Sequence, residues 1–416
     1  MLYSFFFLTL FDKNTHSTQK NVKEIINQIS PLQLIAAGSI VVLFIIQIIF
    51  VAKRRKVVTH RHKHRLGQGE ALPPVSVVVV IGNEIDYLYE YIPVLLEQDH
   101  PEYEIVIVND CGGTDVTIAM EQMAAHNPKI KCTTISKDDK FNHSRKMPLM
   151  VGIKAAKYDN IVMTHSLALP TTNKWLSFIA RGFVGADIVI SYNSMEQGTS
   201  LASKIIRASD FHSTTRALTA ACNGKAYKAS MCNMGYTKNI FFKNGFSHLR
   251  LSLGEDDLFI QRIATKQNVA VIINPHCTTK IPQPGNIKWW WENRKYFTYV
   301  FKFYPQWVKN IQAIELTSRL LYFAVTLLLI VMPLLQMINI ATQIPELILA
   351  PQIAAIAFGL FTIREITMLA IFASIAKRVG DKGLLLGCSI YDKIEPLTQP
   401  MLAIARRTSP PAGLWL

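Results

Sequence analysis

The chain has 416 residues, a formal net charge of +15 and a hydrophobic fraction of 50%. This length allows one domain of roughly 200 to 250 residues plus further elements, and the apolar content is high for a purely soluble protein. The basic excess does not predict nucleic-acid binding, because much of it flanks apolar segments and no RNA- or DNA-binding module is recognisable. The six cysteines form no Cys-x-x-Cys pair, so we expect free thiols in a reducing compartment.

The first long apolar segment predicts a transmembrane helix over residues 34–52, because no charge interrupts it. Seven basic residues follow between positions 53 and 65, against three before it. The positive-inside rule therefore places a basic linker, residues 53–74, in the cytosol and an N-terminal segment, residues 1–33, outside. The run is too long and too far from Met1 for a cleaved signal peptide.

Two apolar segments near the C-terminus predict a returning hairpin. Residues 320–340 are long enough to span a bilayer. Residues 347–375 form a second, transmembrane or interfacial helix, because Arg364 and Glu365 interrupt the apolar run. The remaining residues, 376–416, are expected to be a cytosolic amphipathic tail.

Between the membrane segments, short apolar runs alternate with helical patterns. The apolar runs predict strands at residues 75–81, 104–108, 130–135 and 160–164. The patterns between them predict helices at residues 87–97, 116–126 and 146–157. This alternation predicts an α/β fold with a doubly wound parallel sheet and ligands at the carboxyl ends of its strands.

Directly after the second predicted strand, Asp110 leads into a turn that contains Gly112 and Gly113. A carboxylate at a strand end is placed to accept hydrogen bonds from a nucleotide base or ribose. The alternative is that the turn is only structural, with Asp115 capping the next helix.

Three consecutive carboxylates, Glu255, Asp256 and Asp257, precede an apolar helical stretch. They could cap that helix and oppose its dipole. Crowding of like charges raises carboxyl pKa values, however, and is typical of sites that need a general base.

A third candidate is the aromatic and basic stretch 288–296, which includes Trp291 and Arg294. It fits an aromatic belt at a membrane interface or a stacking platform for a sugar or nucleotide. The basic stretch with His60, His62 and His64 favours contact with lipid headgroups over a metal site.

Together these pieces resemble glycosyltransferase family 2 with the GT-A fold, particularly membrane-tethered bacterial members of the kind common in Bacteroidetes. The resemblance covers roughly residues 74–302. It is carried by four motifs in family order: VSVVVVIGNE (75–84), DHPEYEIVIVND (99–110), KFNHSRKMPLMVGIKAAK (140–157) and GEDDLF (254–259).

The resemblance implies a GT-A domain at residues 75–305 that binds a nucleotide-diphosphate sugar. On that basis Asp256 is the base that deprotonates the acceptor hydroxyl, within the carboxylate group Glu255, Asp256 and Asp257. The residues expected at the nucleotide sugar are Asn83, Glu84, Asp110, Lys146 and His165. Trp291 and Arg294 are expected to contact the acceptor or the leaving diphosphate.

Two family motifs are altered. The Asp-x-Asp metal motif is replaced by His165, Ser166 and Leu167, so no metal ligands are predicted, although Mg²⁺ or Mn²⁺ use stays open. The Gln-x-x-Arg-Trp motif of processive members is replaced by Glu292, Lys295 and Tyr296 at its three defining positions. We therefore expect no long-chain polymerisation.

The sequence thus predicts a non-processive, inverting glycosyltransferase in a bacterial inner membrane, multi-pass and with a cytosolic catalytic domain. Its acceptor would be lipid-linked or a glycan, as in cell envelope polysaccharide assembly. Two alternatives stay open: a catalytically inactive homologue that acts as a binding or scaffold partner in glycan assembly, and a membrane structural or transport component.

Overall fold

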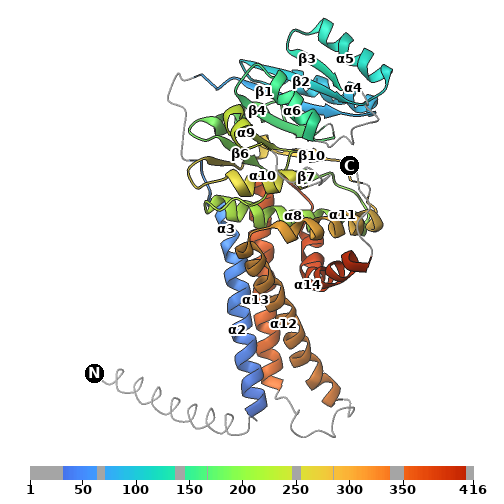
Figure 1. The fold of residues 1–416 in the computed structure, drawn as a ribbon. Coiled ribbons are helices and arrows are strands. Elements are labelled where there is room, and N and C mark those ends of the chain that lie inside the picture. Colours follow the sequence, from blue (N-terminus) through green and yellow to red (C-terminus); the bar gives the residue numbers. More distant parts are fainter. Residues whose placement is uncertain are drawn as a thin grey trace, which may run out of the picture. The chain divides into compact units, whose positions relative to one another are not determined.

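The structure is a computed structural model that describes residues 31–62, 71–135, 146–165, 167–245, 254–283, 285–337 and 351–408. It divides into two units (Figure 1). The larger unit contains Val51–Ile314 and Met368–Leu416, and the smaller unit contains Met1–Phe50 and Glu315–Thr367. Most of the expected N-terminal segment, residues 1–30, lies outside the described residues.

A seven-stranded sheet forms the centre of the larger unit, with the order β3-β2-β1-β4-β8-β6-β9 among the described strands. Strand β8 is antiparallel to both of its neighbours, whereas the other pairs are parallel. The strands are β1 (Val75–Ile81), β2 (Tyr103–Asp110), β3 (Ile130–Ile135), β4 (Asn160–His165), β6 (Ile188–Ser191), β8 (Met234–Thr237) and β9 (Val269–Ile272). The predicted mostly parallel, doubly wound sheet is confirmed.

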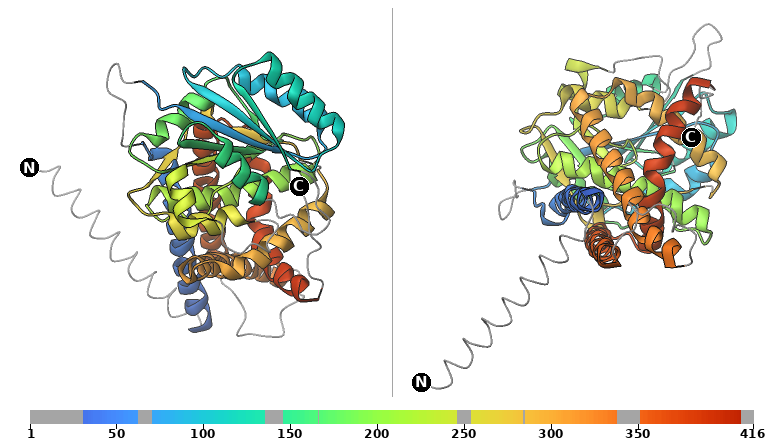
Figure 2. Two further views of the ribbon diagram at one scale, coloured as in Figure 1. Left: turned by 45° about the horizontal axis from the view of Figure 1, so that its top comes forward. Right: turned by 90° about the horizontal axis from the view of Figure 1, so that it is seen from below.

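Helices cover both faces of this sheet (Figures 1 and 2). Successive side chains of a strand point to opposite faces, so Val77 and Val79 share one hydrophobic cluster with α4, α5 and α7, while Val78 belongs to another with α6 and α8. These helices are α4 (Ile85–Leu96), α5 (Thr114–His126), α6 (Lys146–Ala155), α7 (Trp175–Ala180) and α8 (Leu201–Cys222). The all-apolar run of β1 is explained by this double coverage.

A smaller sheet and further helices complete the larger unit. The sheet has the order β5-β10-β7. Its strands are β5 (Leu169–Pro170), β7 (Asn193–Met195) and β10 (Thr279–Ile281). The helices are α3 (Arg55–Thr59), α9 (Lys238–Asn244), α10 (Glu255–Ile263), α11 (Ile287–Val300) and α14 (Leu385–Thr408), with short 3₁₀ turns at Arg181–Phe183, Pro275–Cys277 and Phe301–Phe303.

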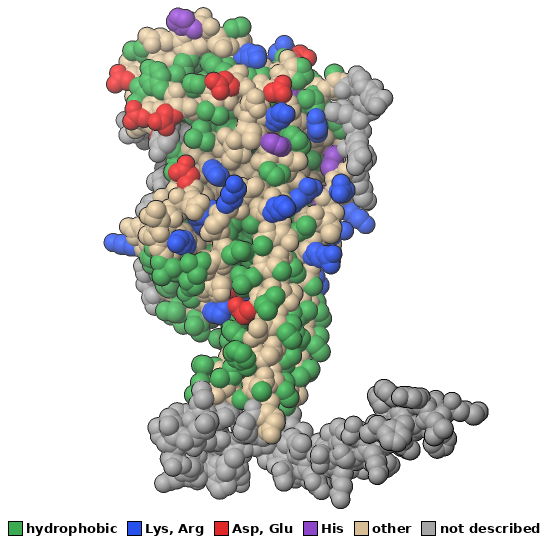
Figure 3. Space-filling model, turned by 180° about the vertical axis from the view of Figure 1, so that it is seen from behind, with side chains coloured by type: hydrophobic (Ala, Val, Ile, Leu, Met, Phe, Trp, Pro, Cys, Tyr) green, Lys and Arg blue, Asp and Glu red, His purple; other side chains and the backbone are tan. Residues whose placement is uncertain are grey.

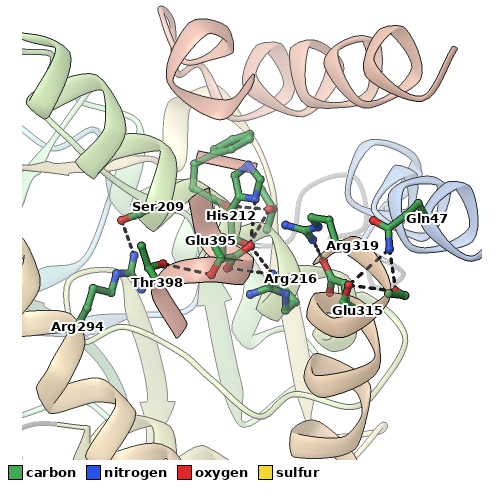
Figure 4. A network of polar contacts seen from close by, with 12 residues as sticks. Gln47, Ser209, His212, Arg216, Arg294, Glu315, Arg319, Glu395 and Thr398 are labelled. Carbon is green, nitrogen blue, oxygen red and sulfur yellow. Dashed lines mark hydrogen bonds and ion pairs between the residues drawn. The ribbon is translucent and has the colours of Figure 1, made fainter. Parts of the chain in front are cut away.

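The C-terminal segment from Met368 onward belongs to the larger unit, where α14 packs against α8 and α11. Buried charges join α14 to α8. Arg216 donates to both carboxylate oxygens of Glu395, at 3.1 and 3.2 Å, and His212 Nδ1 lies 3.7 Å from the same carboxylate (Figure 4). Burial lowers the pKa of His212 to about 4, so the imidazole is neutral near pH 7 and only Arg216 forms an ion pair with Glu395.

A second buried ion pair fixes the chain just before α14. Arg207 on α8 donates to Asp381 at 2.6 Å, and Tyr192 donates to the same carboxylate at 2.8 Å. All three side chains are almost completely buried. Breaking such a pair leaves an uncompensated buried charge, which costs about 3–5 kcal/mol. The expected tail is therefore a fixed part of the larger unit.

Three helices are long and apolar enough to cross a membrane by length and composition: Ile35–Thr59, Gln306–Met332 and Gln352–Val379. They correspond to α2 (Pro31–Lys53) with α3, to α12 (Gln306–Met337) and to α13 (Pro351–Val379). The predicted one N-terminal and two C-terminal apolar helices are confirmed. The face of these helices drawn in Figure 3 is largely hydrophobic.

Within the smaller unit the apolar helices pack through a core that includes Ile40, Tyr322, Leu329 and Ala357. A polar contact also joins α2 to α12, because Gln47 Nε2 donates to Ser318 Oγ at 2.8 Å. Helix α13 continues through Arg364 and Glu365 without a break. Arg364 is fully buried and lies over the Phe323 ring at 5.1 Å, so the charged pair that divides the apolar run in the sequence does not divide the helix.

Candidate active site

The register of the central strands brings several predicted residues to one edge of the sheet. Val80 pairs with Val108 on one side and with His165 on the other. Asp110 ends β2, and the turn with Asn83 and Glu84 follows β1. These side chains therefore belong to the carboxyl edge of the parallel strands, where ligands bind in open α/β sheets.

The turns after β1 and β2 are held together by their own polar groups. Asn83 Oδ1 accepts a hydrogen bond from Gly113 N at 3.1 Å, and Glu84 Oε2 accepts one from Gly82 N at 2.8 Å. The two turns approach so closely that a Cβ atom at position 112 would lie 2.4 Å from the Gly82 carbonyl oxygen. Gly112 is therefore required for this contact.

Lys146 begins α6 and is 3% exposed. Residues 136–145, which precede it and carry the first part of the KFNHSRK motif, lie outside the described residues. The assignment of Lys146 to the nucleotide sugar stays a prediction.

Beside the sheet edge lies a cavity of about 180 Å³. Four of the predicted site residues line it: Asp256, Asp257, His165 and Arg294. Asn83, Glu84, Asp110 and Lys146 do not line it. The predicted residues thus fall into two groups, one at the turns after β1 and β2 and one around this cavity.

The start of α10 places Asp256 at the cavity. Gly254 precedes the helix with φ +81°, and a Cβ atom there would lie 2.8 Å from Val300 Cγ1. The Asp256 carboxylate accepts hydrogen bonds from Met231 N at 3.1 Å and from Asp257 N at 3.0 Å. Backbone N–H donors orient this carboxylate at the wall of the cavity. Glu255 is the first residue of α10.

Asp257 is far more enclosed than Asp256, being 1% exposed. Its carboxyl group accepts a hydrogen bond from Ala229 N at 3.3 Å and bonds to the Tyr304 hydroxyl. Burial, with a smaller contribution from the neighbouring Asp256, raises the pKa of Asp257 to about 7 against the opposing charge of Lys228. These contacts join α10 to the segment that follows α11.

His165 ends β4 with one ring nitrogen occupied. Its Nδ1 accepts a hydrogen bond from Leu167 N at 3.1 Å. Because that nitrogen accepts, the neutral ring carries its proton on Nε2. Within the described part of the chain, no group of three or more His, Cys, Asp or Glu side chains could hold a metal ion.

Helices α8 and α11 form a second wall of the cavity. Ser209 Oγ on α8 accepts hydrogen bonds from Trp290 Nε1 at 2.7 Å and from Arg294 at 2.8 Å. Trp289 and Trp290 line the cavity, whereas Trp291 does not and instead packs against the main hydrophobic core. The aromatic stretch 288–296 therefore contributes Trp289 and Trp290 to the cavity wall, and not Trp291, which the resemblance had suggested.

Two polar residues of this wall were missed by sequence reasoning, Asp210 on α8 and Lys228 in the segment before β8, and neither has a motif around it. Asn293 on α11 lies within the candidate stretch 288–296 but was not named as a site residue from the sequence. Only α8 gives a sequence signal for such a residue, because four polar side chains lie close together there. They are Ser209, Asp210, Ser213 and Thr214.

Comparison with known proteins identifies part of the chain. Residues 76–166 match the model of the family "Glycosyl transferase family 2". No curated protein sequence matches the chain significantly. The resemblance drawn from the sequence is confirmed for this segment.

Solved structures of similar fold include the mannosyltransferase PcManGT from Pyrobaculum calidifontis in complex with GDP-Man and Mn²⁺. It is 16% identical, with a TM-score of 0.50 over 84% of this chain and 98% of that one. A crystal structure of residues 1–349 of TarS from S. aureus is 15% identical, with a TM-score of 0.37 over 80% of this chain and 91% of that one. The likeness to PcManGT confirms the GT-A fold class.

The pKa of Asp257 predicts a pH-dependent stability. A carboxyl whose pKa is higher in the folded protein stabilises the fold fully below about pH 4 and loses this contribution as the pH rises through about 7. We expect the melting temperature of the wild type to fall between pH 5 and pH 8 more steeply than that of Asp257→Asn, which carries no titrating group there.

The control for this experiment is Asp159→Asn, which removes an exposed carboxyl just before β4 and should follow the wild type. Thermal unfolding in detergent at each pH measures all three proteins. Parallel pH profiles for the wild type and Asp257→Asn would show that Asp257 titrates normally.

Proposed function

We propose that this glycosyltransferase moves one sugar per cycle, with inversion, from a nucleotide-diphosphate sugar to a lipid-linked or glycan acceptor at the cytosolic face of a bacterial inner membrane. The position of the Asp256 carboxylate in a cavity beside the carboxyl edge of the sheet carries this proposal. Family membership of residues 76–166 supports the nucleotide-sugar donor.

In the proposed reaction the donor lies along the sheet edge, with Asn83, Glu84 and Asp110 at its nucleotide. Asp256 removes the proton of an acceptor hydroxyl while the oxygen attacks the anomeric carbon. The bond from that carbon to the diphosphate breaks, and the nucleoside diphosphate leaves with the electron pair. A single base and direct displacement invert the configuration at the anomeric carbon.

The leaving diphosphate needs positive charge or hydrogen-bond donors. His165 lines the cavity, and its Nδ1 accepts a hydrogen bond from Leu167 N. We propose that His165 and Lys146 stabilise the leaving group, while Arg294 serves the acceptor side of the cavity.

PcManGT is described with GDP-Man and Mn²⁺, but the corresponding residues fit a divalent cation poorly in this chain. His165 Nδ1 already accepts a hydrogen bond, and Leu167 has no ligand atom. Mg²⁺ and Mn²⁺ prefer oxygen ligands. We derive no catalytic step through a metal.

Helix α11 supports a non-processive reaction. At the positions where processive members have Gln and Arg, Glu292 and Lys295 form an ion pair of 2.6 Å. Lys295 is 4% exposed, so its charge is satisfied within its own helix.

The surface of α14 supports a location at the lipid surface. Large apolar side chains are exposed along it, and Arg406 and Arg407 lie in its last turn. The exposed apolar residues are Leu385, Leu386, Leu397, Met401 and Ile404. An apolar helix face with basic residues favours the interface of an anionic membrane.

Asp256→Asn should abolish turnover and spare donor binding. Removing a general base costs about 10² to 10⁴ in rate, while the asparagine oxygen can still accept the Met231 N–H bond. Turnover of a panel of radiolabelled UDP and GDP sugars and binding of the same nucleotides measure the two effects in purified full-length protein.

Asp159→Asn is the matched control and should keep full turnover. Substantial turnover by Asp256→Asn would refute the base assignment. A wild type that binds nucleotide sugar but transfers none of the panel would favour the inactive homologue.

Chelation of divalent cations should leave donor affinity within about twofold, because the described residues supply no metal cluster. His165→Ala should weaken the donor about fivefold to tenfold, the loss expected for one hydrogen bond of about 1 kcal/mol. Titration of labelled donor with EDTA and with added Mn²⁺ measures both. If donor binding strictly required Mn²⁺, the proposal that this site binds its donor without a metal would be wrong.

The proposed orientation can be tested with a membrane-impermeant maleimide on intact spheroplasts. A cysteine introduced at Lys13, in the expected outer segment, should be labelled. Lys56→Cys, an exposed position after α2, should react only after lysis, as should those native cysteines that are not buried. The reverse pattern would place the sheet-containing unit outside the cell.

A further inference from the structure

A second carboxylate, Asp210, lines the same cavity as Asp256 but from a different element. It lies on α8, whereas Asp256 lies at the start of α10. The proposed chemistry uses one base, so Asp210 has no part in it so far. Burial raises the pKa of Asp210, and Arg294 and Lys228 oppose the shift.

The two cations that face Asp210 are held in place by other contacts. Arg294 donates to Ser209 Oγ at 2.8 Å. Lys228 Nζ donates to Ser213 Oγ at 3.2 Å and lies 5.1 Å from the centre of the Phe297 ring. Three carboxyl groups, those of Asp210, Asp256 and Asp257, line the same cavity and offset these two positive charges. The wall is not a site of strong positive charge.

Asn293 adds an unsatisfied acceptor to this wall. Its Oδ1 is buried and has no hydrogen-bond partner among the described residues. A buried polar atom left without a partner costs about 1–3 kcal/mol, and such atoms are rare unless a ligand or water completes them. A ligand hydroxyl in the cavity would supply the missing donor.

The wall also has flat apolar surface. Trp289 is half-buried and lines the cavity, and the Trp290 indole is fixed by its bond to Ser209. Aromatic rings next to a few well-placed polar groups are typical of pockets for small organic ligands. A ligand that fits must combine hydroxyl donors for Asp210 and Asn293, hydroxyl acceptors for Arg294 and Lys228, and an apolar face for the indole.

We infer that the wall formed by α8 and α11 binds the terminal sugar of the acceptor, so that the reacting hydroxyl belongs to a saccharide and not to a bare polyprenyl phosphate. A sugar ring carries both hydroxyl donors and acceptors together with a C–H face. A lipid phosphate carries hydrogen-bond acceptors, so it cannot donate to Asn293 Oδ1 or to Asp210 as sugar hydroxyls can. This inference rests on the proposed function and assigns its acceptor class.

The test uses full-length protein in a detergent without a sugar headgroup, such as a zwitterionic amine oxide. Tryptophan fluorescence is titrated with methyl glycosides of glucose, galactose, mannose and N-acetylglucosamine, and separately with undecaprenyl phosphate. Binding of UDP and GDP is measured in parallel. We expect at least one glycoside to quench the tryptophan fluorescence saturably. We expect undecaprenyl phosphate to cause no specific quenching.

Asp210→Asn should weaken glycoside binding about tenfold or more, as expected for a lost charged hydrogen bond, and leave nucleotide affinity unchanged. Asn293→Leu should also weaken the glycoside, yet keep or raise the melting temperature, because it removes an unsatisfied buried oxygen. This second variant keeps the test decisive if Asp210→Asn folds poorly. Asp159→Asn should match the wild type.

Failure of every glycoside to bind, preferential binding of undecaprenyl phosphate, or unchanged glycoside affinity in both variants would overturn the inference. Failure of the proposed function has different signatures, since the wild type would then bind no nucleotide, or would bind nucleotide sugars and transfer none of them. A protein that binds nucleotide but no saccharide would retain the proposed function and refute only the acceptor class.

Discussion

The pairing of buried charges on α8 is the constraint on which the rest of the larger unit depends. Arg207 and Arg216 lie on a helix packed between the central sheet and α14, where an unpaired guanidinium would be costly. Their carboxylate partners, Asp381 and Glu395, come from the far end of the chain. The fold is therefore complete only when the C-terminal segment is in place, and the same helix then presents Ser209 and Asp210 to the cavity.

The candidate site is built from two kinds of structure, backbone turns at the sheet edge and side chains from helices. The turns after β1 and β2 use backbone geometry, with Gly112 allowing their close approach and Asn83 linking them. The cavity uses side chains from helices, whose positions depend on tertiary packing. Under the proposed function, the turns would bind the nucleotide of the donor and the cavity would bind the acceptor. Variation in α8 and α11 would then change acceptor binding without disturbing nucleotide binding.

The sequence predicted the sheet well because β1 and β2 are continuous apolar runs of strand length, a local pattern that few other structures produce. The three consecutive carboxylates also stand out in the sequence, and the family resemblance named Asp256 among them as the base, a role that stays a prediction. The residue pattern alone could not show that Asp257 is enclosed, since this follows from the packing of Tyr304 and Ala229 around it.

Asp210 and Lys228 were missed, and Asn293 was not singled out within the stretch 288–296, because their significance arises only when distant parts of the chain converge on one cavity. The antiparallel strand β8 was not predicted, since a segment as short as Met234–Thr237 carries little strand signal and its direction is set by tertiary packing.

The membership of α14 in the larger unit has a practical consequence for obtaining a soluble form of the enzyme. Ending the chain before the second apolar helix would remove Asp381 and Glu395 and leave two arginines of α8 without counterions. Such a fragment would expose the surface that α14 covers and would tend to aggregate. A soluble version would therefore have to keep residues 368–416 together with the sheet-containing part. They could be joined by a short connector that replaces those parts of the two C-terminal apolar helices that lie outside the larger unit, or co-expressed as a separate polypeptide.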